Sequence, residues 1–140
     1  MAKQIFVNLP IDNLKTSMAF YDALGFKNNP QFTDDKAACM VYSEHIYVML
    51  HSHGSWRRFT QRPIPASASS EVMLALSLDS KAEVDTMNDI AKANGGTADI
   101  NPKQDLGFMY SRALSASSCV LYSTAAMLLA LILFEDRDLA

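Results

Sequence analysis

Residues 4–26, QIFVNLPIDNLKTSMAFYDALGF, combine a strand pattern, a helix pattern and a turn in one stretch. Apolar side chains occupy every second position over the first eight residues, which is typical of a β-strand with one buried face. Asp12 or Asn13 is suited to cap a helix, and apolar residues then recur at helical spacing until Gly25. The stretch therefore predicts a strand followed by an amphipathic helix.

Three further strands are expected after this helix, at residues 26–33, 37–43 and 45–51, which completes a βαβββ unit. Residues 52–70, SHGSWRRFTQRPIPASASS, are rich in serine and proline and show no periodicity, so they are expected to form a loop. The unit would therefore end before a connecting segment.

The same pattern returns 67 residues further along the chain, where VMLALSLDS (72–80) matches IFVNLPIDN (5–13). A second helix pattern follows and stops at the glycine pair Gly95-Gly96. With 140 residues, the chain is long enough for one domain. We expect a single domain (1–140) made of module one (about 3–52), a linker (about 53–70), module two (about 71–113) and a divergent apolar tail (114–140).

The opening NLPIDNLKTSMAFYDALGF (8–26) resembles the NLPVxDLxxSxxFYxxLGF signature of the vicinal oxygen chelate superfamily, which comprises glyoxalase, bleomycin resistance and extradiol dioxygenase proteins. The stretches 32–50, 71–96 and 103–113 resemble the family's later strands and its second module. This resemblance implies an α+β fold with paired βαβββ modules that form a curved mixed sheet with helices on the outer face. The last strand of the second module is expected to be altered, because the sequence departs from the family pattern there.

Many members of that family hold a divalent metal ion with four side chains, one each from the first, fourth, fifth and eighth strands. Here Phe6 and Met73 stand at the first- and fifth-strand positions, and neither side chain suits such an ion. The resemblance therefore implies a protein without a metal cofactor. As an alternative, His51 is a candidate for the fourth-strand ligand, and His53 follows at a spacing that can bind zinc.

The tail is the part of the chain that departs most from the family. LSASSCVLYSTAAMLLALIL (114–133) stands where the family has a hairpin with its last metal ligand, and an echo of that hairpin, FEDRD, appears only at 134–138. Two explanations of this departure are open. One is an insertion followed by a truncation, and the other is a change of reading frame. Serines dilute the apolar run, so a buried strand or helix, or a contact in a dimer, is favoured over a membrane span.

Strand alternation turns a second set of side chains away from the expected helices and toward the hollow side of the sheet. Aromatic, thioether and amide groups there suit a flat, partly apolar ligand, whereas the alternative is that they fill a second core. Arg112 is the best candidate to pair with a carboxylate or phosphate. The candidate ligand-binding residues are Phe6, Asn8, Tyr47, Met49, His51, Met73, Tyr110 and Arg112.

The charge balance excludes an obvious nucleic-acid surface, because 15 acidic residues outnumber 12 basic ones and the net charge is -3. The aromatic and basic residues at 56–62 are therefore interpreted as part of a loop. The N-terminus lacks the apolar core of a secretory signal, which favours a cytoplasmic protein. Cys39 and Cys119 have no metal-binding or redox spacing and are expected to be buried thiols.

Three hypotheses about function follow from these patterns. The first is a metal-free binding protein for a small organic molecule, with a homodimer that completes the pocket, as in the bleomycin-resistance branch. The second is an enzyme of the glyoxalase-type lyase or extradiol-type dioxygenase kind, which would use His51 and ligands that the sequence does not identify. The third is a non-catalytic, rearranged family member whose apolar tail drives oligomerisation.

Overall fold

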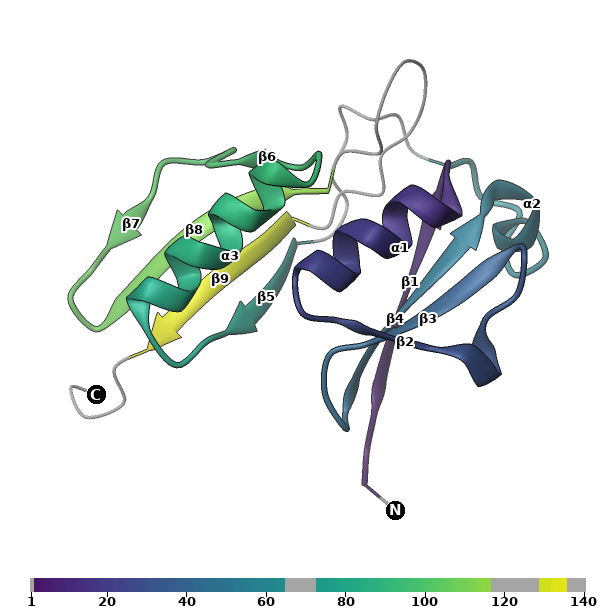
Figure 1. Cartoon of the computed structure of the whole chain (residues 1–140), viewed down its shortest axis with the longest axis horizontal. Helices are drawn as coiled ribbons and strands as arrows, with labels where there is room; N and C mark the ends of the chain where they lie inside the picture. The colour runs from purple at the N-terminus through teal and green to yellow at the C-terminus, as the bar shows by residue number, and fades with distance from the viewer. Residues whose placement is uncertain (1, 65–72, 117–128, 136–140) are drawn as a thin grey trace. The chain divides into compact units, whose positions relative to one another are not determined.

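The computed structural model describes residues 2–64, 73–116 and 129–135. These residues fall into two compact units, one built from residues 2–64 and the other from residues 73–116 and 129–135 (Figure 1). Each unit consists of a β-sheet with one long helix packed on it, so the α+β architecture expected from the sequence is confirmed. The two units are described separately below.

The first unit contains a four-stranded sheet with strand order β1-β4-β3-β2. The first strand in the chain runs parallel to β4, whereas the β4-β3 and β3-β2 pairs are antiparallel. Its elements are β1 (Ile5–Ile11), α1 (Leu14–Ala23), β2 (Lys27–Asn29), the 3-10 turn η1 (Pro30–Phe32), β3 (Ala37–Val41), β4 (Ile46–Ser52) and the short helix α2 (His53–Trp56).

Local signals in the sequence set the limits of α1. The side chain of Asn13 accepts a hydrogen bond from the amide of Thr16 at 2.9 Å, which caps the first turn. After the helix, Gly25 adopts a φ of 96°, a left-handed conformation that side chains with a Cβ rarely take. The predicted helix and its stop are therefore confirmed.

The core of the first unit lies between α1 and the sheet. The helix packs against β3 and β4, where alternate side chains are fully buried. Because successive side chains of a strand point to opposite faces, the remaining residues of β3 and β4 are turned to the face away from α1. The buried residues of this core include Phe20, Tyr21, Leu24, Phe26, Ala38, Met40, Val48 and Leu50.

Two expectations for the first unit were wrong in extent. The strand expected at 26–33 ends at Asn29, because Pro30 begins a 3-10 turn whose first amide, that of Gln31, is bonded by the Asn29 side chain. The connecting loop expected at 52–70 begins instead with the helix α2, which Ser52 caps by accepting from the amide of Ser55. Both differences come from local capping that hydrophobic periodicity does not reveal.

The second unit repeats the topology of the first, with strand order β5-β9-β8-β6 and β7 paired to β8. Strand β5 is parallel to β9, as β1 is to β4. The predicted βαβββ repeat is therefore confirmed. The elements are β5 (Met73–Ser77), α3 (Lys81–Ala93), β6 (Thr97–Ala98), β7 (Gln104–Asp105), β8 (Met109–Ser115) and β9 (Leu129–Glu135).

The apolar tail supplies the strand β9, which pairs with both β5 and β8. Of the alternatives left open by the sequence, residues 129–135 thus take the strand form, and the last strand of the second module is present despite its altered sequence. Residues 117–128, which include Cys119, lie outside the described residues. In the part of the chain that the structure describes, no helix has the length and apolar character needed to span a bilayer.

Candidate functional site

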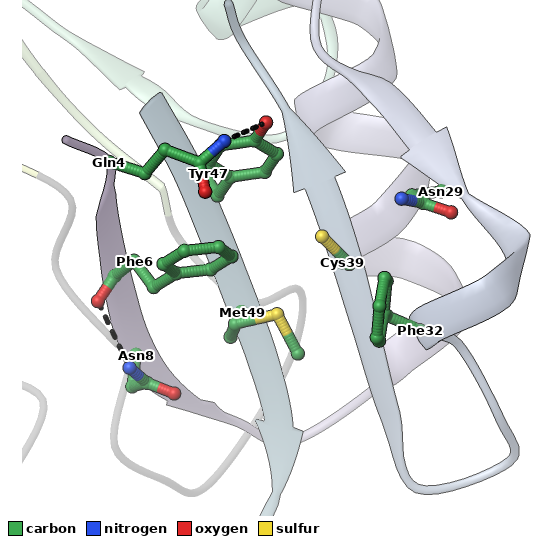
Figure 2. A pocket seen from close by; sticks show the side chains of 8 residues that line it. All are labelled: Gln4, Phe6, Asn8, Asn29, Phe32, Cys39, Tyr47 and Met49. Carbon is green, nitrogen blue, oxygen red and sulfur yellow. Dashed lines mark hydrogen bonds between the residues drawn. The ribbon is translucent and has the colours of Figure 1, made fainter. Parts of the chain in front are cut away.

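A pocket of about 520 Å³ lies on the first unit, on the face of the sheet away from α1. Strand β1 contributes Phe6 and Asn8, and strand β4 contributes Tyr47 and Met49 (Figure 2). The parallel register places Phe6 opposite Tyr47 and Asn8 opposite Met49. The structure therefore brings together four of the side chains that strand alternation selected as candidates.

Four further residues line the same pocket and were not selected from the sequence, namely Gln4, Asn29, Phe32 and Cys39. Alternation along β3 was a usable signal for Cys39, since this residue is paired with Met49 in the antiparallel register. No such signal existed for Asn29 and Phe32. Asn29 caps the 3-10 turn and Phe32 is its last residue, and this turn was not predicted from the sequence.

The apolar part of the pocket is an aromatic stack. The rings of Phe6 and Tyr47 are parallel to within 13°, and their centroids are 4.5 Å apart. Phe6 is 49% exposed and Phe32 is 64% exposed, whereas Phe20, Tyr21 and Phe26 of the same unit are buried. Aromatic surface that stays accessible in a concave site can cover the face of a flat ligand.

His51 is not among the residues that line the pocket, and it is only 4% exposed. Its Nε2 is 2.9 Å from Oδ1 of Asn8, and its Nδ1 is 3.1 Å from the hydroxyl oxygen of Ser55 in α2. The amide nitrogen of Asn8 donates to the carbonyl of Phe6, which can only accept, so the Asn8 oxygen must face His51. His51 therefore donates from Nε2 and accepts at Nδ1, as a neutral imidazole does.

Burial lowers the pKa of His51 below its ordinary value of 6.5, and the charge of Asp34 opposes this shift only partly. The unfolded chain then takes up a proton at a higher pH than the folded protein. The stabilisation that comes from neutral His51 is present above pH 6.5 and is lost as the pH falls through the lower folded-state pKa.

We expect the free energy of unfolding to decrease as the pH is lowered from about 6.5 to 5, and the substitution His51→Gln to flatten this dependence. Glutamine keeps an N–H that can donate to Asn8 but does not titrate. Urea denaturation at a series of pH values measures the effect. The exposed His45, replaced by glutamine, is the matched control. An unchanged pH slope in His51→Gln would show that another group causes it.

The two histidines considered as zinc ligands do not converge on one point. The imidazole of His53 is 2.9 Å from a carboxylate oxygen of Asp12, whereas both nitrogens of His51 are bonded to other partners. Within residues 2–64, 73–116 and 129–135, no group of three or more His, Cys, Asp or Glu side chains is placed to hold a metal ion. The donor set of the described part of the first unit therefore does not fit a metal centre.

Tyr110 and Arg112, the candidates from the second unit, contact α3 with their side chains. The Tyr110 hydroxyl donates to Asp85 at 2.6 Å, and Arg112 bonds Asp85 at 2.9 Å and Asp99 at 2.6 Å. The carboxylates of Asp85 on α3 and of Asp99 directly after β6 attract the guanidinium to this face of β8. Arg112 is thus engaged by internal partners, and its pairing with a ligand anion stays a prediction.

Titration in this cluster follows from the same contacts. The hydrogen bond from Tyr110 and the guanidinium of Arg112 hold the pKa of the Asp85 carboxyl below its usual range. The bond to Asp85 in turn raises the pKa of Tyr110 to about 12. The last candidate, Met73, lies in β5, and its side chain is outside the described residues.

The pocket holds no group poised for acid–base or covalent chemistry among its described lining residues. Cys39 is buried, and burial raises the pKa of its thiol, so it stays protonated near neutral pH. The other polar side chains in the lining are neutral amides and a phenol. What this arrangement can do is stack against a planar group and form hydrogen bonds with it.

The fold is the one found in solved structures of glyoxalase, bleomycin resistance and dioxygenase family proteins. No protein-family model and no curated protein matches the sequence. A glyoxalase/bleomycin resistance protein/dioxygenase family enzyme from Burkholderia phytofirmans is similar with a TM-score of 0.72 and 16% identity, over 96% of this chain and 99% of that one.

Two further solved structures illustrate the range of the likeness. A glyoxalase-related enzyme from Fulvimarina pelagi has a TM-score of 0.73 and 14% identity, over 96% of this chain and 89% of its own. The fosfomycin resistance protein FosX from Listeria monocytogenes has a TM-score of 0.65 and 13% identity, over 99% of this chain and 97% of its own. At such identities the likeness establishes the fold alone.

Proposed function

We propose that this protein binds a small organic molecule in the pocket of the first unit and does so without a metal ion. The observation that carries the proposal is the parallel Phe6–Tyr47 stack in a pocket of about 520 Å³. Ligand sites commonly have volumes of roughly 300 to 1,000 Å³ and combine apolar walls with a few polar groups. The aromatic, thioether and amide lining of this pocket has that composition.

The state of His51 favours binding over metal-dependent catalysis. A histidine that ligates a metal must offer a free nitrogen lone pair toward the pocket, and here both nitrogens are engaged by Asn8 and Ser55. This is why we prefer a binding protein to a lyase or dioxygenase that would use His51 as a ligand.

The neighbours in fold give the proposal its context. Their names refer to bleomycin resistance, fosfomycin resistance and dioxygenase activity, which all concern small organic molecules. Because one fold can host many functions, these names support a class of ligand size and not a particular compound. The cytoplasmic location and the homodimer expected from the sequence stay predictions, and light scattering tests the second.

We expect quinoline, a planar neutral aromatic, to bind the protein in ligand-observed NMR and Phe6→Ala to weaken its binding about five- to tenfold. Removing the ring deletes half of the stack while leaving an exposed position that tolerates alanine. Phe108→Ala is the matched control, since Phe108 is 51% exposed and lies in the other unit. Equal affinity in both variants, or a loss of binding after EDTA treatment, would contradict the proposal.

A further inference from the structure

The charges around the pocket restrict what it can accept. Of the described residues that line the pocket, none carries an ionised side chain at neutral pH. An ionised ligand would give up part of its hydration on entry and would find no counter-charge in the lining, which is unfavourable. The lining therefore favours an uncharged ligand.

One polar end of the pocket is satisfied internally. The amide nitrogen of Gln4 donates to the carbonyl of Glu44 and to the hydroxyl oxygen of Tyr47, both at 3.1 Å. The Tyr47 hydroxyl donates its own proton to that same Glu44 carbonyl at 3.1 Å. These bonds use both amide protons and the phenol proton, so this end has no donor left for a ligand.

Asn29 at the opposite end of the sheet is different. Its Oδ1 accepts from the backbone amide of Gln31 at 3.0 Å, which fixes the orientation of the side-chain amide. Figure 2 shows its nitrogen on the side of the pocket and its oxygen turned away. Among the bonds recorded for the described residues, none uses the protons of this nitrogen. Asn29 thus presents an uncommitted N–H donor to the pocket.

A donor covered by a ligand without receiving an acceptor is more costly than a spare lone pair on an oxygen. From this we infer that the ligand is an uncharged planar molecule with a hydrogen-bond acceptor, a carbonyl oxygen or aromatic nitrogen, which the Asn29 amide binds while the ring lies along Phe6 and Tyr47. This inference deepens the proposed function and depends on it, since it names the ligand class of the same pocket.

Three ligands of nearly equal shape test the inference by fluorescence titration: 2-acetylnaphthalene, 2-ethylnaphthalene and 2-naphthoate. The first is neutral with an acceptor, the second is neutral without one, and the third is an anion. We expect 2-acetylnaphthalene to bind about five- to tenfold more tightly than 2-ethylnaphthalene, and 2-naphthoate to bind at least about tenfold more weakly than 2-acetylnaphthalene.

The variant Asn29→Asp isolates the donor, because aspartate keeps an oxygen for the Gln31 amide and replaces the pocket nitrogen by a second oxygen. We expect it to remove the preference for 2-acetylnaphthalene over 2-ethylnaphthalene. Gln31→Glu adds the same charge at an exposed neighbouring position and serves as the control.

The outcomes separate this inference from the proposed function. Equal affinities for 2-acetylnaphthalene and 2-ethylnaphthalene would overturn the inferred ligand class, and so would equal affinities for 2-acetylnaphthalene and 2-naphthoate. Neither result would contradict the proposal that the pocket binds a small molecule. A preference for 2-acetylnaphthalene that survives in Asn29→Asp would also overturn it. If none of the three binds and Phe6→Ala changes nothing for quinoline, the proposed function itself fails.

Discussion

Replacing Phe26 by alanine is expected to lower the free energy of unfolding by about 3 to 5 kcal/mol. The side chain is 1% exposed, and its ring lies 5.2 Å from that of Tyr21 and 4.9 Å from that of Tyr42. It directly follows the left-handed Gly25, so the turn places it in the space between helix and sheet. Alanine would leave a cavity that these rings and the backbone turn cannot close.

Urea denaturation followed by circular dichroism measures this loss. Phe32→Ala is the matched control, because Phe32 is 64% exposed and lines the ligand pocket instead of the core. We expect Phe32→Ala to change the free energy of unfolding by less than about 0.5 kcal/mol. A similar loss in both variants would mean that the core of the first unit does not lie where the structure has it.

Replacing Arg112 by methionine is expected to lower the free energy of unfolding by about 2 kcal/mol. Methionine keeps much of the apolar stem but leaves Asp85 and Asp99 without their common partner. Asn88, which is fully buried, loses a bond as well, since its oxygen faces Nη2 of Arg112 at 2.7 Å when the amide is correctly oriented. The carboxylates are 45% exposed, so water compensates for part of the loss.

The same urea experiment distinguishes this cluster from an ordinary surface ion pair. Lys27→Met removes a pair with Asp22 whose side chains are 76% and 62% exposed, and it should cost less than about 0.5 kcal/mol. Arg112→Lys should recover only part of the stability, because an ammonium group cannot bond two carboxylates in the forked geometry of guanidinium. Equal costs for Arg112→Met and Lys27→Met would disprove a structural role for the cluster.

Much of the fold was predictable because its signals are local. The caps at Asn13 and Ser80 and the left-handed glycines at 25 and 95 lie within a few residues of the helices that they limit. The alternation in β1 and β4 likewise selected Phe6, Asn8, Tyr47 and Met49, which the structure places in one pocket. Their role in binding a ligand stays a prediction.

The parts that could not be predicted depend on contacts between distant residues. The ion pairs of Arg112 with Asp85 and Asp99 could not be predicted, because alternation alone cannot tell which face of β8 the helix covers. The hydrogen-bond partners of His51, one of them 43 residues away, could not be predicted either. Asn29 was not predicted as a pocket residue, because its place in the pocket depends on a turn that has no periodicity.

By itself, the sequence determined the two long helices, most of the strands and the repeat of a βαβββ module, since caps, turns and alternation act between neighbours in the chain. Only the tertiary structure decided which polar groups are satisfied internally and which still face the pocket. The reason is that a hydrogen bond between side chains on different strands depends on register and burial, which no local pattern encodes.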